Sequence, residues 1–168
     1  MRYALTLLLL VASGSAMTQA VSGHEPASQN TSMTAAAKET GYGTPGNARD
    51  AKRTVDISLL DTMRIQPAQL AVRQGETVRL RIRNTGAVAH EFVLGSKDEI
   101  IEHRDMMRRM PTSMHNDANA VSVAPGGTAE LIWRFSKPGT FLYACLVPGH
   151  WEAGMQGTVT VSAEAKPK

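Results

Sequence analysis

The chain has 168 residues, of which 42% are hydrophobic and 20% are charged, and its formal net charge is +3 at pH 7. The lysines and arginines are dispersed, and no basic run is interleaved with aromatic residues, so we predict no nucleic-acid partner. The single cysteine excludes an internal disulfide and leaves a free thiol, an intermolecular bond or a metal ligand.

Residues 1–20 have the pattern of a secretory signal peptide. Arg2 is the positive region, an apolar stretch runs from Leu5 to Ala12, and cleavage is expected after Ala16 or Ala20. The stretch is short for a membrane span, which needs about 20 apolar residues. We therefore expect an exported protein, periplasmic in a bacterium, with no membrane span in its mature form. A retained N-terminal anchor is the alternative.

Residues 21–52 are rich in small and polar residues and nearly free of large apolar ones. Such a segment buries too little surface to offset its ordering entropy, so we predict a flexible leader. It contains His24 and Met33, which are interpreted as solvated; a weak metal-collecting arm is the alternative. We place one domain at residues 53–163 and a short tail at 164–168.

From residue 54 onward, apolar and polar residues alternate in short runs separated by turn-forming residues, which is typical of β-strands. About eight short strands with frequent turns predict an all-β, antiparallel sandwich or barrel. The expected strands are Val55–Leu59, Leu70–Val72, Val78–Arg83, His90–Leu94, Val121–Val123, Ala129–Phe135, Thr140–Cys145 and Thr158–Val161.

One segment interrupts the β pattern. Residues Asp98 to Arg109 lack alternation and contain good helix formers, Ser96 or Asp98 can cap the start, and Pro111 ends the segment. We predict one short helical insertion between two strands.

The run from Cys145 through His150 to Met155 places a thiolate, an imidazole and a thioether in one short loop. Two histidines and one cysteine in a plane, with a long axial methionine, form a mononuclear blue-copper site. His90 is the candidate for the second histidine. The alternative for each loop residue alone is a buried thiol, a turn histidine or a core methionine.

These residues resemble the cupredoxin family, whose members are Greek-key β-sandwiches with a type 1 copper site. The resemblance implies His90, Cys145 and His150 as equatorial ligands, Met155 as the axial ligand and one copper per chain. The likeness is closer to periplasmic cupredoxins linked to copper tolerance, which combine a His-Glu-Phe-Val-Leu-Gly strand, a methionine-rich insertion and a Cys-x-x-Pro-Gly-His-x-x-x-Gly-Met loop. The matching features are Gly75, Asn84-Thr85-Gly86, His90, Gly139-Thr140-Phe141, Cys145, Pro148-Gly149-His150, Met155 and Gly157.

One position departs from this resemblance. Plastocyanin- and azurin-like electron carriers commonly have Asn after the first histidine, whereas this chain has Glu91. Contacts around the ligands tune a metal site, so we expect Glu91 to affect colour and reduction potential rather than binding.

The insertion, Glu99 to His115, is rich in sulfur and imidazole donors. Its first four donors are spaced i, i+3, i+4 and i+7, which puts them on one helical face. Methionine fills irregular core gaps well, so this face is predicted to pack on the sandwich. The alternative is a second site that prefers Cu(I). The candidate residues are His103, Met106, Met107, Met110, Met114 and His115.

Two functions use the same four ligands. The first is copper tolerance, in which the protein binds, oxidises or hands on copper and meets a periplasmic redox or copper-transfer protein. The second is a soluble one-electron carrier between respiratory partners. An enzyme acting alone is disfavoured because four protein ligands leave no open position for substrate. Oxidation of Cu(I) at the protein surface, a cuprous-oxidase activity, is kept as an alternative.

Overall fold

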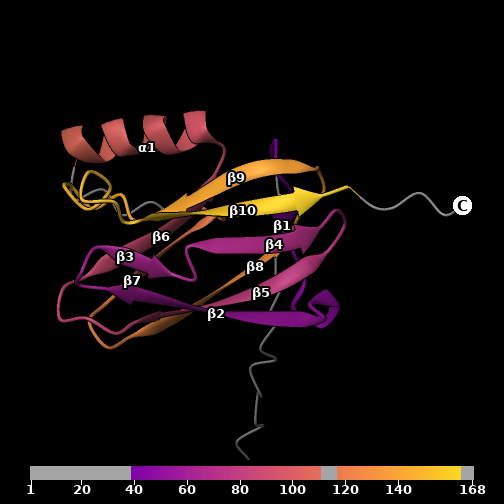
Figure 1. Ribbon diagram of the computed structural model, residues 1–168, viewed down its shortest axis with the longest axis horizontal. Coiled ribbons are helices and arrows are strands. Elements are labelled where there is room, and N and C mark those ends of the chain that lie inside the picture. The colour runs from indigo at the N-terminus through magenta and orange to yellow at the C-terminus, as the bar shows by residue number, and fades with distance from the viewer. Residues whose placement is uncertain (1–38, 111–116, 164–168) are drawn as a thin grey trace, which may run out of the picture. The chain divides into compact units, whose positions relative to one another are not determined.

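The computed structural model describes residues 39–110 and 117–163. Within them, ten strands form two five-stranded sheets that pack face to face (Figure 1). The first sheet contains, in spatial order, β1 (Thr44–Pro45), β8 (Thr128–Arg134), β5 (Thr77–Asn84), β2 (Arg53–Leu60) and β3 (Arg64–Gln66). The second contains β4 (Gln69–Arg73), β10 (Gln156–Ser162), β9 (Gly139–Ala144), β6 (His90–Gly95) and β7 (Ala120–Val123). The prediction of an all-β sandwich is confirmed.

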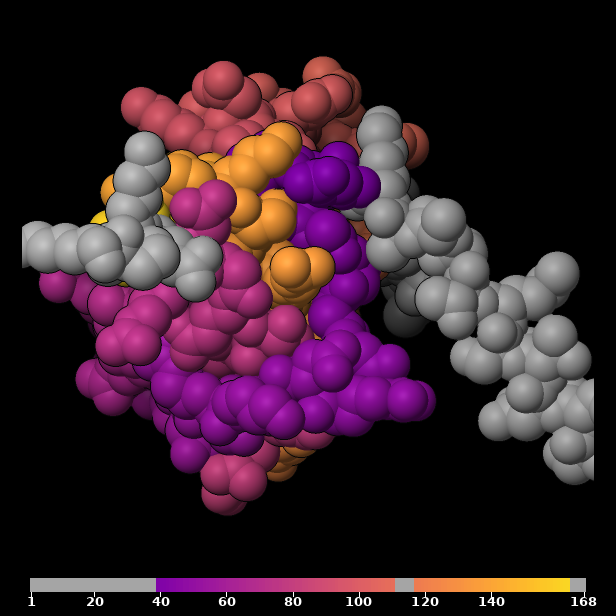
Figure 2. All heavy atoms as spheres, turned by 90° about the vertical axis from the view of Figure 1, so that its right-hand side faces the viewer, coloured from indigo at the N-terminus to yellow at the C-terminus, as the bar shows by residue number. Residues whose placement is uncertain are grey.

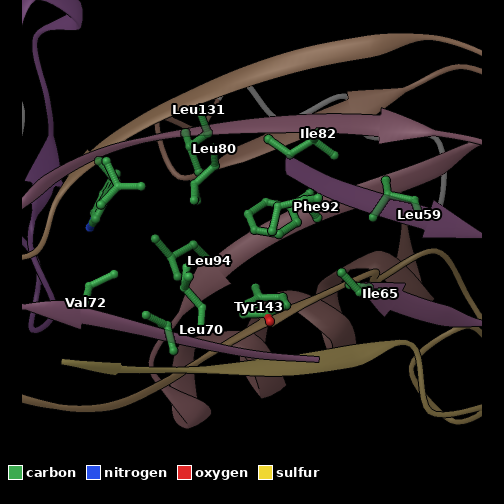
Figure 3. Close-up of a cluster of buried hydrophobic side chains, with 14 of the residues drawn as sticks. Leu59, Ile65, Leu70, Val72, Leu80, Ile82, Phe92, Leu94, Leu131 and Tyr143 are labelled. Atoms are coloured by element: carbon green, nitrogen blue, oxygen red, sulfur yellow. The ribbon is translucent and has the colours of Figure 1, made fainter. Parts of the chain in front are cut away.

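Most neighbouring strands are antiparallel, but β2 pairs with β5 and β4 pairs with β10 in parallel. The parallel pairs arise because the chain crosses between the sheets rather than returning by hairpins alone. Alternating side chains of both sheets point inward and form one core. Figure 3 shows Leu80 from the first sheet and Leu94 from the second directed toward one another in that core.

The single described α-helix, α1 (Lys97–Arg109), lies where the helical insertion was predicted. Ser96 caps it: the Glu99 N–H donates to the Ser96 hydroxyl, and the Ser96 N–H donates to the Glu99 carboxylate. This reciprocal capping box satisfies N–H groups that have no partner within the helix. Ile100 and Met107 are buried on the side of α1 that faces β6 and β9. The helix is therefore fixed to the sheet that carries His90.

Residues 39–52 depart from the predicted flexible leader. They include β1, which pairs with β8, and the short 3₁₀ helix η1 (Ala48–Asp50). Tyr42 is 1% exposed and stacks on Trp133 with ring centroids 5.3 Å apart. Figure 2 shows these indigo residues lying against orange residues of later strands. Residues before the predicted domain start at residue 53 therefore pack on the sandwich, because the Tyr42 side chain supplies an apolar contact within a polar segment.

All eight predicted strands are present, and β1 and β3 are additional. Both are too short, at two and three residues, to show an alternating pattern. The predicted signal peptide, residues 21–38 of the predicted leader and the 164–168 tail lie outside the described residues. Along the described residues, no helix has the length and apolar character that a membrane span requires.

The sheet register gathers the predicted ligands at one end of the sandwich. β6 begins at His90, β9 ends immediately before Cys145, and β10 begins immediately after Met155. Val93 pairs with Ala144, so the His90 end of β6 extends beside the residues that follow β9. Figure 1 shows the loop between β9 and β10 at this end, beside α1.

Candidate metal centre

Three predicted ligand side chains converge at this end of the sandwich. The Nδ1 atoms of His90 and His150 lie 3.2 Å apart. The Cys145 Sγ lies 3.3 Å from the His150 Nδ1 and 3.9 Å from the His90 Nδ1. Among the described residues, this is the group of histidine, cysteine and carboxylate side chains whose donor atoms all lie within 4.8 Å of one another. One ion could contact all three.

Burial sets the protonation of this cluster. Removal from water raises the pKa of the Cys145 thiol to about 11, because burial penalises the charged thiolate. Burial also lowers the pKa of His150, and the nearby His90 adds to that shift. At neutral pH the cluster therefore holds a protonated thiol, which must lose its proton to become a metal ligand.

The loop between β9 and β10 is shaped by its own backbone. The Cys145 N–H donates to the Met155 carbonyl oxygen, and the Met155 N–H donates to the His150 carbonyl oxygen, each at 3.0 Å. Gly149 has φ of 90° just before His150, a conformation that glycine adopts without the strain other residues incur. These features turn His150 back toward Cys145.

Met155 is fully buried, in the same core cluster as Cys145. Its backbone contacts to Cys145 and His150 hold it at the base of the loop. This position is compatible with the axial role that the family resemblance implies.

Glu91 contributes its backbone rather than its side chain to the cluster. Its N–H donates to the Cys145 Sγ at 3.3 Å and so links β6 to the loop. Its side chain is buried and points to His103, with Oε1 3.8 Å from the His103 Nε2. Burial, followed by the charge of Asp117, raises the pKa of Glu91 to about 7. The backbone of Glu91 therefore links β6 to the ligand loop at the position where plastocyanin- and azurin-like carriers commonly have asparagine.

Asp61 also contacts the cluster, and sequence reasoning missed it. Its Oδ1 lies 3.2 Å from the His90 Nε2, and its Oδ2 accepts from the Ala87 N–H at 2.6 Å. That backbone hydrogen bond is the main reason why the pKa of Asp61 is lowered. No sequence spacing indicates this residue, because the contact forms only when the turn between β2 and β3 meets the start of β6.

The described residues of the candidate second site have different degrees of burial. Met107 is 7% exposed and packs between α1 and the second sheet, Met106 is half-buried, and Met110 is exposed. His103 lies between the carboxylates of Glu91 and Asp117, at 3.8 and 3.9 Å. Met114 and His115 lie outside the described residues. Met107 therefore packs against the second sheet, and copper binding by residues of the insertion stays a prediction.

The donor chemistry of the main cluster fits copper. Thiolate and thioether sulfur favour Cu(I), whereas imidazole also suits Cu(II). His90 and Cys145 are each about 1% exposed or less, so water is largely excluded, while His150 is half-buried. The cluster supplies one thiol sulfur and two imidazole nitrogens, and these donor atoms lie close enough together to contact one copper ion.

Comparison with known proteins agrees with this chemistry. Residues 51–162 match the family of copper binding proteins described as the plastocyanin/azurin family. The copper-resistant cuproprotein CopI of Rubrivivax gelatinosus is 46% identical over 155 residues, covering 92% of this chain and 94% of the relative. CopI of Pseudomonas aeruginosa is 36% identical over 149 residues, covering 71% and 82%. The structure of auracyanin A, a "blue" copper protein from Chloroflexus aurantiacus, superposes with a TM-score of 0.56 at 26% identity, covering 65% of this chain and 98% of that one. The chain belongs to the plastocyanin/azurin family of copper-binding proteins.

Proposed function

We propose that this protein is a periplasmic cupredoxin that holds one type 1 copper and acts in copper tolerance by binding, oxidising or handing on copper. The observation that carries the proposal is the convergence of one thiol and two imidazole Nδ1 atoms within 4.8 Å at one end of the sandwich. His90, Cys145 and His150 are the proposed equatorial ligands, and Met155 is the proposed axial ligand.

The chain itself would do three things at this site. His90, His150 and the Cys145 thiolate would hold the ion, and the hydrogen-bonded loop between β9 and β10 would keep these donors in place when the ion changes oxidation state. The surrounding core excludes water from Cys145. When bound, copper would supply a one-electron couple between Cu(I) and Cu(II).

The tolerance role is supported by relatives and by the insertion. The two relatives described above are both called copper-resistant cuproproteins. Met110 at the C-terminal end of α1 offers an exposed thioether, and Arg108 of α1 forms an ion pair with Glu152 of the ligand loop. We propose that the insertion provides additional Cu(I) binding, with Met114 and His115 as further donors.

A soluble one-electron carrier is the second candidate. Its support is the likeness to auracyanin A and the four-residue donor set, which leaves no open position for a substrate. In this case the protein would exchange electrons with a respiratory redox protein and would not need a copper-transfer partner.

Copper titration of the purified mature protein tests the metal site. Cu(II) is added first and Cu(I) second, while visible absorption and bound metal per chain are recorded. We expect one intensely coloured Cu(II) per chain, and Cys145→Ser should abolish the colour because the thiolate is the charge-transfer donor. Colour that persists in Cys145→Ser would refute the site.

Deletion of the gene separates the two functions. Copper sensitivity with normal respiration is expected for copper tolerance. Unchanged copper resistance, together with rapid reduction of the protein by a respiratory partner, would instead establish the electron carrier.

A further inference from the structure

We propose that Asp61 is a positioning residue for the metal centre: its carboxylate holds the His90 ring so that Nδ1 presents a lone pair to the metal. This inference rests on the proposed function, because it concerns the same site. It assigns a role to a residue that lies outside the four proposed ligands and on a different loop, the turn between β2 and β3.

The geometry fixes which nitrogen of His90 carries the proton. The His90 Nε2 lies 3.2 Å from the Asp61 Oδ1, while the Nδ1 of the same ring faces the Cys145 Sγ and the His150 Nδ1. A neutral imidazole has one N–H donor and one acceptor nitrogen, and an ionised carboxylate can only accept. The proton therefore resides on Nε2, and the lone pair lies on the inward-facing Nδ1.

Asp61 is itself held in place by the chain segment that precedes β6. Its Oδ2 accepts from the Ala87 N–H at 2.6 Å, and its Oδ1 lies 3.5 Å from the Val88 nitrogen. Gly86 lies directly against the carboxylate, since a Cβ added there would come within 1.8 Å of the Asp61 Oδ1. The carboxylate is thus fixed from both sides, although its side chain is 40% exposed.

The two nitrogens of the His90 ring have different neighbours: Nε2 contacts the Asp61 carboxylate, and Nδ1 faces the Cys145 Sγ. The His90 side chain is fully buried, so rotation of the ring would require loss of its contact with Asp61. A carboxylate on the outer nitrogen of a metal-binding histidine orients the ring and increases its basicity as a ligand. Added negative charge beside the ligand stabilises Cu(II) relative to Cu(I), so Asp61 should lower the reduction potential.

The test uses three variants of the full-length protein. Asp61→Asn keeps the shape and removes the charge. Gly86→Ala keeps the carboxylate but displaces it. Asp56→Asn is the matched control: it removes the same charge from β2, where the carboxylate instead accepts from Arg81 on the exposed face of the sheet.

Two readouts separate a positioning role from a merely structural one. The first is the His90 tautomer, measured by long-range ¹H–¹⁵N NMR of the metal-free protein. The second is the reduction potential after copper loading. We expect an Nε2–H tautomer in the wild type. We expect Asp61→Asn and Gly86→Ala each to lower the preference for Cu(II) over Cu(I) by about tenfold, equivalent to a rise of about 59 mV for one electron, and Asp56→Asn to leave it within about twofold.

A wild-type His90 protonated on Nδ1 would overturn the inference, as would a potential in Asp61→Asn equal to that of Asp56→Asn. If Asp61→Asn does not fold, the wild-type tautomer and Gly86→Ala still decide the question. Failure of the wild type to bind copper would refute the proposed function, whereas the NMR result on the metal-free protein would stand independently.

Discussion

The backbone N–H of Cys145 donates to the carbonyl oxygen of Met155 at 3.0 Å, which joins the two ends of the loop that carries three of the four proposed ligands. This hydrogen bond uses backbone atoms only, so it does not depend on the ligand side chains. Single substitutions at these side chains should therefore change the metal chemistry more than they change the fold.

Met155→Leu tests that separation. Leucine has a similar volume, and volume-conserving exchanges in a core usually cost less than about 1.5 kcal/mol. We expect the variant to fold and to keep the thiolate-to-copper colour. Its reduction potential should rise, because an apolar leucine offers no electron pair and makes the surroundings less polar, which disfavours the more highly charged Cu(II). Denaturant unfolding and voltammetry measure the two effects. A colourless Met155→Leu protein with wild-type stability would show that Met155 has a larger role than the axial one.

Metal affinity should depend steeply on pH. The pKa of the Cys145 thiol is raised to about 11, and metal binding requires the thiolate. The lowered pKa of His150 keeps that ring neutral above pH 7. Between pH 7 and 9, one proton is therefore released on binding, and the apparent Cu(I) affinity should rise about tenfold per pH unit. Anaerobic competition titrations at pH 7, 8 and 9 measure the slope.

Cys145→Ser is the control for this slope, because a serine hydroxyl has no comparable titration. An equal slope in that variant would assign the released proton to another group.

The same thiol links stability to pH in the metal-free protein. Its pKa is raised from 9.0 in the unfolded reference to about 11 in the fold, so the folded state binds the proton more tightly. The resulting stabilisation is fully present below pH 9 and is lost as the pH rises through about 11. Denaturant unfolding from pH 8 to 11 should show a decline in wild type that is smaller in Cys145→Ser. Equal declines would contradict this assignment.

Local sequence patterns accounted for most of the fold and for the proposed ligands. Alternation over Val55–Leu59 predicted a strand, and Ser96 or Asp98 as a cap predicted where a helix begins, because both patterns act over a few neighbouring residues. The burial of Tyr42 and the contact of Asp61 with His90 could not be predicted in this way. Both depend on segments that meet only after the sheets have paired, and neither residue is part of a local motif.

Methionines of α1 allow packing to be separated from copper binding. Met107 is 7% exposed and contacts the cluster around Ile100, whereas Met110, the residue that caps the C-terminal end of α1, is 51% exposed. We expect Met107→Ala to reduce the free energy of unfolding by about 2–5 kcal/mol, and Met110→Ala to change it by less than about 0.5 kcal/mol. If the insertion binds Cu(I), Met110→Ala should instead reduce the bound Cu(I) per chain. Unchanged stoichiometry in Met110→Ala would remove this residue from the proposed second site.

Tyr42 should contribute to stability despite its position in a polar segment. Its ring stacks on Trp133, its hydroxyl donates to the Leu94 carbonyl oxygen at 3.1 Å, and it accepts from the Asn119 side chain at 2.9 Å. Tyr42→Ala removes both the packing and the hydrogen bonds, so we expect a loss of about 3–5 kcal/mol in the free energy of unfolding. Tyr42→Phe keeps the ring and should lose about 1–2 kcal/mol, because the Asn119 amide still donates to Leu94 at 2.7 Å. Denaturant unfolding of the two variants measures both values. If Tyr42→Ala unfolds within about 0.5 kcal/mol of the wild type, residues 39–52 do not contribute to the domain core, and the domain begins near residue 53 as the sequence alone predicts.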